Sequence, residues 1–301
     1  MPDALATRCR RALLVALALL AAIPSLAAAL PYVALDAGHG GTDPGATGRL
    51  PAGAVSDLPP RADEDGAPLV WEMDVTMDVT RRLEAVLRAR GFQVLMTRTG
   101  DLGGADRIHS TVRSDLAARV AMANEAGIDV FVSIHANALR ETSTGTETYH
   151  HRSSSAAARE LAGHVQRRVV ERLGLPDRGV RRAGFYVLAR TVAPAVLVEG
   201  AFVSNPDEAA LLAQAATRQA LAEAVGQGIV DADAAGVFRD VPPVAKAPAR
   251  KPLLGPWRKR PPRVPAGYRL VRTGKNNPVG RGGWLAVIST YVHPPAPLSQ
   301  R

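Results

Sequence analysis

Four residues of the types that bind metals or move protons stand at predicted strand ends or at a helix start. The segments 32–39, 130–135 and 195–199 each read as a buried strand that ends on His39, His135 or Glu199. Glu72 stands where a helix is expected to begin. In an open α/β sheet, chemistry collects where the carboxyl ends of parallel strands meet. Two histidines and a glutamate at that edge suggest a hydrolytic zinc site, which Glu72 could complete.

A catalytic zinc ion usually takes three protein ligands and leaves its fourth position to water. The metal lowers the pKa of that water, and a nearby carboxylate can move protons during the reaction. His39, Glu72 and His135 are suitable ligand types, and Glu199 is a carboxylate on the same edge. The chain has no local motif of the HExxH kind, so spacing alone is weak evidence for a site.

Each candidate also has a structural interpretation. His39 could be a polar residue of a glycine-rich turn, and Glu72 a first-turn acid favoured by the helix macrodipole. Glu199 could be a buried structural acid. His150 and His151 are neighbours on a predicted strand and face opposite sides, so at most one could point at the site, and surface positions are expected for both.

The elements expected around these residues alternate between strands and helices from residue 32 to residue 235. Apolar spacing predicts helices over 71–90, 115–126, 155–173 and from Asn205 to about residue 234, and strands over 32–36, 92–98, 129–134, 146–150, 185–189 and 195–199. This alternation indicates an α/β fold with a mainly parallel twisted sheet flanked by helices. Residues 49–70, rich in Pro, Gly and acidic residues, are expected to form a long exposed flap outside the core.

The two ends of the chain differ from its centre. Residues 1–29 read as a signal peptide, with Arg8, Arg10 and Arg11 before a short apolar run. The alternative is an uncleaved membrane anchor, but the run is short for a spanning helix. The only cysteine, Cys9, lies in this segment, so a mature chain would hold no disulfide. We therefore expect export to the periplasm, cell envelope or exterior, with no stable membrane span after the signal is removed.

The C-terminal segment 237–301 reads as a basic, proline-rich linker or tail, with a small β unit expected within 267–292. Residues 239–301 carry 13 Lys or Arg against Asp240 alone, whereas residues 30–238 have a net charge of −5. Such a tail is typical of binding to polyanions. In an exported protein these would be anionic envelope polymers and lipid head groups, not nucleic acid.

Four segments carry a family resemblance. Residues 35–46 (LDAGHGGTDPGA), 71–75 (WEMDV), 133–138 (SIHANA) and 197–205 (LVEGAFVSN) resemble, in this order, the motifs of the zinc-dependent N-acetylmuramoyl-L-alanine amidases of the Amidase_3 type. Residues 145–149 (GTETY) are similar to a strand of that family with an acidic residue near its site. The resemblance covers about residues 31–235. Glycine is displaced by one position in the segment after Glu199, and the connection between Ala138 and Gly145 is short.

The resemblance implies a catalytic domain over residues 30–236 and one Zn²⁺ bound by His39, Glu72 and His135. Glu199 would be the general base and acid, and Glu147 would assist it. The substrate would be peptidoglycan, cut between N-acetylmuramic acid and L-alanine by a monomeric enzyme. Two other functions remain open: a catalytically inactive peptidoglycan-binding protein, and a zinc peptidase of a related α/β fold.

Overall fold

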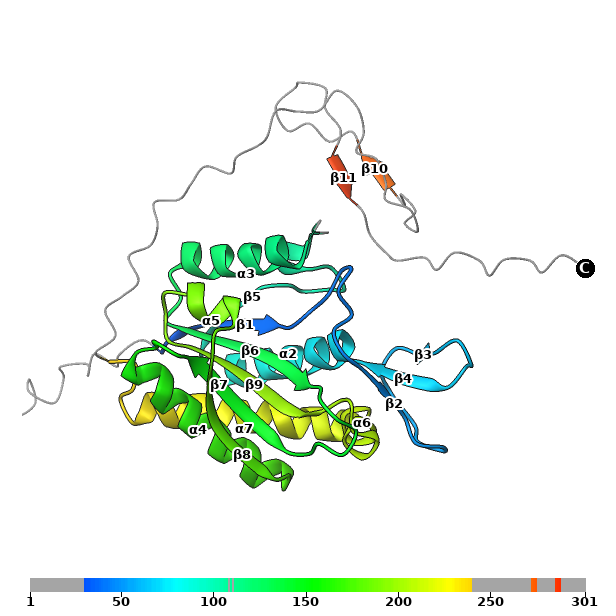
Figure 1. Ribbon diagram of the computed structural model, residues 1–301. Helices are drawn as coiled ribbons and strands as arrows, with labels where there is room; N and C mark the ends of the chain where they lie inside the picture. The colour runs from blue at the N-terminus through cyan, green and yellow to red at the C-terminus, as the bar shows by residue number, and fades with distance from the viewer. Residues whose placement is uncertain (1–29, 108, 110, 240–271, 275–284, 288–301) are drawn as a thin grey trace, which may run out of the picture. The chain divides into compact units, whose positions relative to one another are not determined.

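A computed structural model describes residues 30–107, 109, 111–239, 272–274 and 285–287 (Figure 1). Its centre is one six-stranded sheet in the order β5-β1-β6-β9-β7-β8. The strands are β1 (Tyr32–Ala37), β5 (Gln93–Met96), β6 (Val130–Asn137), β7 (Thr146–His151), β8 (Asp177–Ala183) and β9 (Ala195–Phe202). All neighbours pair in parallel except β7 and β9, which are antiparallel. The predicted α/β fold with a mainly parallel sheet is therefore confirmed.

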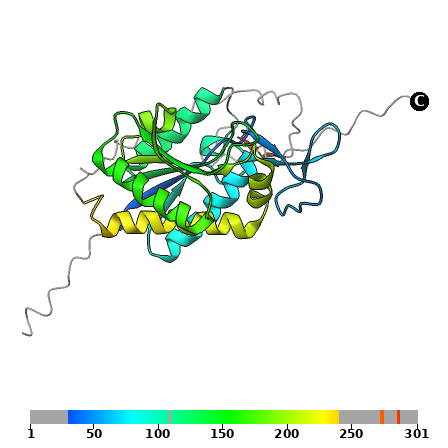
Figure 2. The same cartoon turned by 60° about the horizontal axis from the view of Figure 1, so that its bottom comes forward.

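Helices cover both faces of this sheet. The helices of the main domain are α2 (Glu72–Ala89), α3 (Val112–Ala126), α4 (Ala156–Leu173), α5 (Tyr186–Arg190), α6 (Pro206–Leu212) and α7 (Ala215–Ala234), with a 3₁₀ turn over Gly104–Asp106. Helices α2, α4 and α7 pack on one face, and α3 and α5 pack on the other. Figure 2 turns α4 and α7, which run along each other, toward the viewer.

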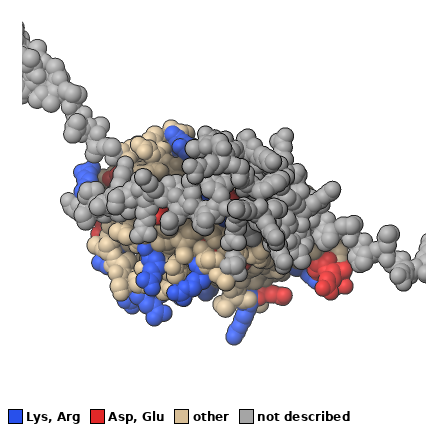
Figure 3. All heavy atoms as spheres, turned by 90° about the horizontal axis from the view of Figure 1, so that it is seen from above, with Lys and Arg blue, Asp and Glu red and all other residues tan. Residues whose placement is uncertain are grey.

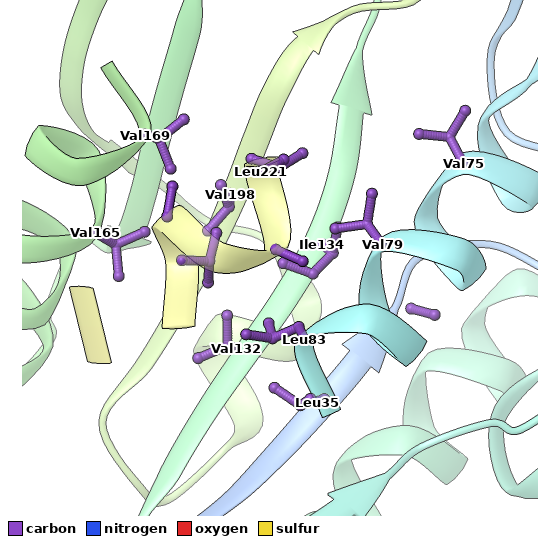
Figure 4. Close-up of a cluster of buried hydrophobic side chains, with 14 of the residues drawn as sticks. Leu35, Val75, Val79, Leu83, Val132, Ile134, Val165, Val169, Val198 and Leu221 are labelled. Atoms are coloured by element: carbon purple, nitrogen blue, oxygen red, sulfur yellow. The ribbon is translucent and has the colours of Figure 1, made fainter. Parts of the chain in front are cut away.

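The larger core lies between the sheet and the α2, α4 and α7 layer. Aliphatic side chains from three strands and three helices meet there, and almost all of them are inaccessible to solvent (Figure 4). Leu83 of α2 packs beside Val132 and Ile134 of β6, and each of the three is 0% exposed. Fully burying a side chain of this size contributes about 1.5–3 kcal/mol. This core fixes α2, and therefore Glu72 at its first residue, against the centre of the sheet.

Local sequence explains where the helices begin and end. The Thr111 side chain accepts a hydrogen bond from the Ser114 backbone N–H, and the Ser114 hydroxyl accepts one from the Thr111 backbone N–H, which forms a capping box at the start of α3. Gly127 ends α3 in the left-handed conformation. Asn205 caps α6 as expected, by accepting hydrogen bonds from the Asp207 and Glu208 backbones.

Two predicted elements differ from the structure, and one strand was not predicted. The expected strand 185–189 is the short helix α5, because a short apolar run does not distinguish a buried helix from a strand. Strand β8 was missed, since this edge strand carries Arg178, Arg181 and Arg182 and shows no clear alternation. The last helix divides into α6 and α7 around Ala213 and Gln214.

The segment 49–70 was also predicted incorrectly in part. It is not a simple flap, because β2 (Thr47–Arg49), β4 (Pro68–Trp71) and β3 (Arg61–Ala62) form an antiparallel sheet in that order. Leu50 and Val70 belong to the main core, at 6% and 1% exposure. Asp57 forms an ion pair with the buried Arg218 of α7. Exposed residues occur both before β3, where Val55 is 81% exposed, and in the β3–β4 turn. Figure 3 shows acidic side chains gathered at that end of the molecule.

The predictions for the chain ends are largely untested. The signal segment 1–29 and most of 237–301 lie outside the described residues, so the domain limits stay predictions. In the C-terminal segment, β10 (Arg272–Gly274) and β11 (Leu285–Val287) pair in an antiparallel manner, in line with the expected small β unit. Across the described parts of the chain, no helix has the length and apolar character needed to cross a bilayer.

Candidate active site

The carboxyl-terminal edge of the parallel strands brings His39, Glu72 and His135 together. One possible ligand atom from each lies within 4.8 Å of those from the other two. Nε2 of His39 is 3.0 Å from Glu72 Oε2, and Nδ1 of His135 is 3.0 Å from Glu72 Oε1. The two imidazole rings meet edge to face with centroids 4.9 Å apart. Three residues predicted from distant segments therefore form one cluster.

Two glycines make room for this cluster. A Cβ on Gly38 would overlap the His135 ring, so only glycine lets that ring lie against the end of β1. Gly45 has a φ of +70°, and a Cβ there would be 2.7 Å from Glu72 Oε2. His39 itself has a φ of 62°, which is uncommon for a residue with a side chain. The glycine-rich segment after β1 therefore leaves the space that the His135 ring and the Glu72 carboxylate occupy.

A buried polar network below the cluster holds the His39 turn. Arg119 of α3 donates hydrogen bonds to the backbone carbonyls of Ala37 and His39 and pairs with Asp36 at 2.8 Å. Arg98 donates to the carbonyls of Ala37 and Gly38, each at 2.9 Å. These two guanidiniums are 1% exposed. They satisfy carbonyls that the strand can no longer pair, and they fix the turn that positions His39.

The charges around the cluster favour a bound cation. Burial lowers the pKa of His39, but hydrogen bonds to Asp43 and Glu72 outweigh burial and raise that pKa to about 10. Burial raises the pKa of Glu72, but hydrogen bonds to His135 and His39 lower it overall. Backbone N–H groups of Ala46 and Ala136 also donate to Glu72, at 2.9 and 3.0 Å. An ionised carboxylate between two imidazoles is a donor set that suits zinc.

Asp43 was not predicted as a site residue. Its Oδ2 lies 3.0 Å from Nδ1 of His39, on the side of the ring opposite to Glu72. A carboxylate in this position fixes the orientation and tautomer of a ligand histidine and makes it a stronger donor. The available signal was the four-residue spacing from His39 within the glycine-rich segment. For Arg98 and Arg119, the sequence offered no comparable signal.

Glu199 lies in a row of side chains that crosses three strands. Its register partners are His135 on β6 and Glu147 on β7. Its Oε2 is buried and accepts no hydrogen bond from the described residues. Burial raises the pKa of Glu199 to about 7, and the charges of Glu72 and Glu147 add to the effect, against that of His135. A carboxyl with such a pKa can both accept and release a proton near neutral pH.

The surroundings of Glu147 lower its pKa, whereas those of Glu199 raise its pKa. Its carboxylate accepts hydrogen bonds from the Tyr149 hydroxyl and from Arg178 Nε, and Asn137 Nδ2 lies 3.3 Å away. Burial raises the pKa of Glu147, but these hydrogen bonds and the nearby arginine charges lower it overall. The two neighbouring carboxyls are therefore driven apart in pKa. Such a separation is typical of sites that use one carboxyl for proton transfer and keep the other ionised.

The other candidate residues lie elsewhere. His150 is 5% exposed, so the expected surface position was wrong; its Nδ1 lies 2.8 Å from the Ser154 hydroxyl. His151 is partly exposed, and its Nδ1 accepts a hydrogen bond from the Ser153 backbone. Both residues belong to the end of β7 away from Glu147. Neither of them is part of the cluster.

The fold and the site define an α/β domain that gathers two histidines and a glutamate at the carboxyl edge of its sheet. Next to them lies Glu199, whose Oε2 accepts no hydrogen bond within the described part of the chain. Residues 33–231 match the family model described as N-acetylmuramoyl-L-alanine amidase, Amidase_3. This chain belongs to that family.

Individual relatives agree with this placement. The chain is 34% identical to N-acetylmuramoyl-L-alanine amidase LytC of Bacillus subtilis over 198 residues, which are 65% of this chain and 34% of that protein. It is 32% identical to an endolysin of Bacillus phage SPP1, over 65% of this chain and 64% of the endolysin. The chain therefore spans about a third of the length of LytC.

Solved structures show the same fold. The N-acetylmuramoyl-L-alanine amidase of Clostridium difficile 630 superimposes with a TM-score of 0.55 at 29% identity, over 67% of this chain and 96% of that one. The catalytic domain of CwlV from Bacillus (Paenibacillus) polymyxa var. colistinus gives a TM-score of 0.54 at 29% identity, over 67% and 97%. Each of these similarities covers about two thirds of this chain.

Proposed function

We propose that this protein is a zinc-dependent N-acetylmuramoyl-L-alanine amidase. It would hydrolyse the amide between the lactyl group of N-acetylmuramic acid and the L-alanine of peptidoglycan stem peptides. The observation that carries the proposal is the cluster of His39, Glu72 and His135 beside the buried Oε2 of Glu199, in a chain of this family. A protein that only binds the cell wall has no need for all four residues.

His39, Glu72 and His135 would hold the zinc ion. When bound there, zinc would supply a Lewis acid for the amide carbonyl and would lower the pKa of a water molecule. The chain's own residues make the position suitable, since Asp43 and two backbone N–H groups orient His39 and Glu72. The buried Arg98 and Arg119 hold the backbone of the turn, so the site is largely formed before any ligand arrives.

Glu199 would carry the proton transfers. Its raised pKa lets it take a proton from the attacking water and then deliver it to the nitrogen of the departing alanine. Without that second transfer, the peptide would have to leave as an unstable amide anion. Glu147 would act through charge, because it stays ionised one strand away and keeps the affinity of Glu199 for a proton high.

The proposal includes an envelope location. Peptidoglycan lies outside the cytoplasmic membrane, which agrees with the predicted signal over residues 1–29. The basic tail over residues 237–301 would hold the enzyme on anionic envelope polymers. A monomer is sufficient, since the described domain contains all the proposed site residues.

Digestion of purified peptidoglycan followed by mass analysis of the products tests the proposal. An amidase creates a new L-alanine amino terminus and leaves the glycan intact. Glu199→Gln is the matched control, because it removes proton transfer while keeping the shape of the side chain. Peptide fragments cut within the stem would instead identify a zinc peptidase. Binding without any cleavage by the zinc-loaded protein would identify a wall-binding protein.

A further inference from the structure

Strand β8 extends the row of site residues beyond Glu147. Arg181 of β8 is the register partner of Tyr149 of β7, so their side chains share one face of the sheet. Glu147 lies two residues before Tyr149 and therefore uses the same face, next to Glu199 on β9. Arg182, the next residue of β8, pairs with His150 and faces the opposite side. Arg181 thus faces the proposed reaction site, and Arg182 does not.

The arginines of β8 leave positive charge on this face. Arg178 Nε donates to Glu147 Oε1, and Arg181 Nε lies 3.4 Å from the same oxygen. One carboxylate therefore faces two guanidiniums. The acid nearest in sequence, Asp177, is already engaged, since its Oδ1 accepts hydrogen bonds from Gln166 and the Gly179 backbone. Glu199 makes no ion pair with either arginine in the described structure.

Arg181 is also open to a ligand. Its side chain is 45% exposed, compared with 30% for Arg178 and 3% for Glu147. Its contact with Glu147 is made through Nε, and among the described residues neither of its terminal nitrogens has a recorded hydrogen bond. A guanidinium presents two parallel N–H groups that match the two oxygens of a carboxylate. Phe185, which is 38% exposed, meets the Tyr149 ring edge to face at 5.1 Å and provides an apolar surface nearby.

We propose that Arg181, set beside Arg178, binds a free carboxylate of the peptide whose amide bond is cut. This inference rests on the proposed function. The lactyl side of that bond has no free carboxylate, because its carboxyl group forms the amide itself. An anion beside the bond must therefore come from the peptide side. The stem peptide would lie across β7 and β8, and the sugar would lie toward β6 and β1.

The spacing of the strands indicates which residue of the stem peptide would reach Arg181. Neighbouring strands lie about 4.8 Å apart, so the Glu147 carboxylate is one such step from Glu199. Arg181 Nε lies 3.4 Å from Glu147 Oε1. The Arg181 head group is therefore roughly 5–8 Å from Glu199. An extended peptide advances about 3.3–3.6 Å per residue. The second residue after the bond therefore reaches Arg181. In a stem peptide that starts with L-alanine, this residue is the γ-linked D-glutamate, whose α-carboxylate is free or amidated.

Two soluble muramoyl tetrapeptides test the proposal with the full-length zinc-loaded protein. They differ only in whether the α-carboxylate of the D-glutamate is free or amidated. The measured quantity is the ratio of kcat/KM for the free acid to kcat/KM for the amide. This ratio cancels any effect of a substitution on the chemical step that both substrates share.

We expect the wild-type protein to prefer the free acid about tenfold, since a charge-assisted hydrogen bond in a partly exposed site is worth roughly that much. Arg181→Gln should bring the ratio close to one, and Arg181→Lys should keep part of it. Arg182→Gln is the matched control on the opposite face and should retain the wild-type ratio.

The possible failures are distinguishable. The carboxylate site is overturned if the wild type cleaves both substrates equally, or if Arg181→Gln and Arg182→Gln change the kcat/KM ratio equally. Either result leaves the amidase proposal standing. A retained preference in Arg181→Gln has the same consequence. Failure of the zinc-loaded wild type to cleave either substrate overturns the proposed function, and the carboxylate site with it.

Discussion

Replacing Asp36 with asparagine should strongly destabilise the domain without changing any of the proposed metal ligands. Asp36 is 1% exposed and accepts hydrogen bonds from Thr97, Ser133 and Arg119, at 2.6, 2.7 and 2.8 Å. An asparagine keeps one oxygen that can accept a hydrogen bond from one hydroxyl group, and its NH2 group can donate to the oxygen of the other hydroxyl. It cannot neutralise Arg119, which is equally buried and, among the described residues, would keep Asp115 alone as a charged partner.

The size of the effect follows from that loss. Removing one member of a buried ion pair costs about 3–5 kcal/mol, and a hydrogen bond to a charged group contributes about 1.5–3 kcal/mol. Because Asp115 still pairs with Arg119 and the hydroxyl contacts survive, we expect the low end, about 3 kcal/mol. This is a large fraction of the roughly 5–15 kcal/mol that stabilises a typical domain.

The effect should also depend on pH. Burial raises the pKa of Asp36, but the charge of Arg119 and hydrogen bonds from Thr97, Ser133 and Arg119 lower it overall. Since the folded pKa is below the unfolded value of about 3.9, Asp36 stabilises the fold above that pH. Its contribution is lost as the pH falls through the folded pKa. The stability gap between wild type and Asp36→Asn should therefore narrow under acid conditions.

Urea unfolding at pH 7 and at a series of values below pH 4 measures both effects. Glu84→Gln is the control, because its ion pair with Arg88 is on the surface and should contribute less than about 1 kcal/mol. The argument fails if Asp36→Asn stays within about 0.5 kcal/mol of wild type at pH 7. It also fails if the gap between the two proteins widens as the pH is lowered.

Three further predictions concern the site, the backbone and the tail. Glu199→Gln should keep its zinc but lose turnover by about 10²–10⁴-fold, whereas His39→Ala should lose the metal, as metal analysis and peptidoglycan digestion will measure. Gly163→Ala should raise the free energy of unfolding by about 0.5–1 kcal/mol, because this α4 position has open space. Gly48→Ala should lower it by more than about 2 kcal/mol, since its Cβ would overlap the Val203 carbonyl oxygen. A chain without residues 240–301 should cleave soluble muropeptides normally but sediment less with whole sacculi at low salt. The difference should shrink as salt is added, because attraction between exposed charges is screened beyond roughly 8 Å at physiological ionic strength.

Each of these predictions has a contrary result. Wild-type digestion by Glu199→Gln would show that another group moves the proton. Equal urea midpoints for Gly48→Ala and Gly163→Ala would contradict the packing at both positions. Equal sedimentation of the full and shortened chains at low salt would leave the tail without a role in wall binding.

Much of the site could be predicted because its residues end buried strands. His39, His135 and Glu199 follow apolar runs, and a parallel sheet brings the ends of such runs to one edge. Glu72 required the family resemblance, because a first-turn acid is common on any helix. Its position between the two histidines depends on the packing of α2 against the sheet, which no local pattern specifies.

The parts that were missed depend on long-range contacts. Strand β8 exists because it pairs with β7, and its arginines are tolerated because it lies at the sheet edge. The segment 49–70 is ordered by the pairing of β4 with β2 and β3, and by the ion pair of Asp57 with the buried Arg218, which is far away in sequence. Arg119 approaches the His39 turn from helix α3, so nothing near His39 in the sequence indicates it. Charged residues in such positions read as surface residues until their partners are known.

Metal-dependent cleavage is the most direct test of the central claim. The protein would be stripped with a chelator, and the release of new L-alanine amino termini from peptidoglycan would be followed while Zn²⁺ is added back. We predict no release by the stripped protein and full recovery at one equivalent of Zn²⁺, with no recovery in His39→Ala. Undiminished release by fully stripped protein, or recovery of His39→Ala to the wild-type rate, would contradict the assignment of this site.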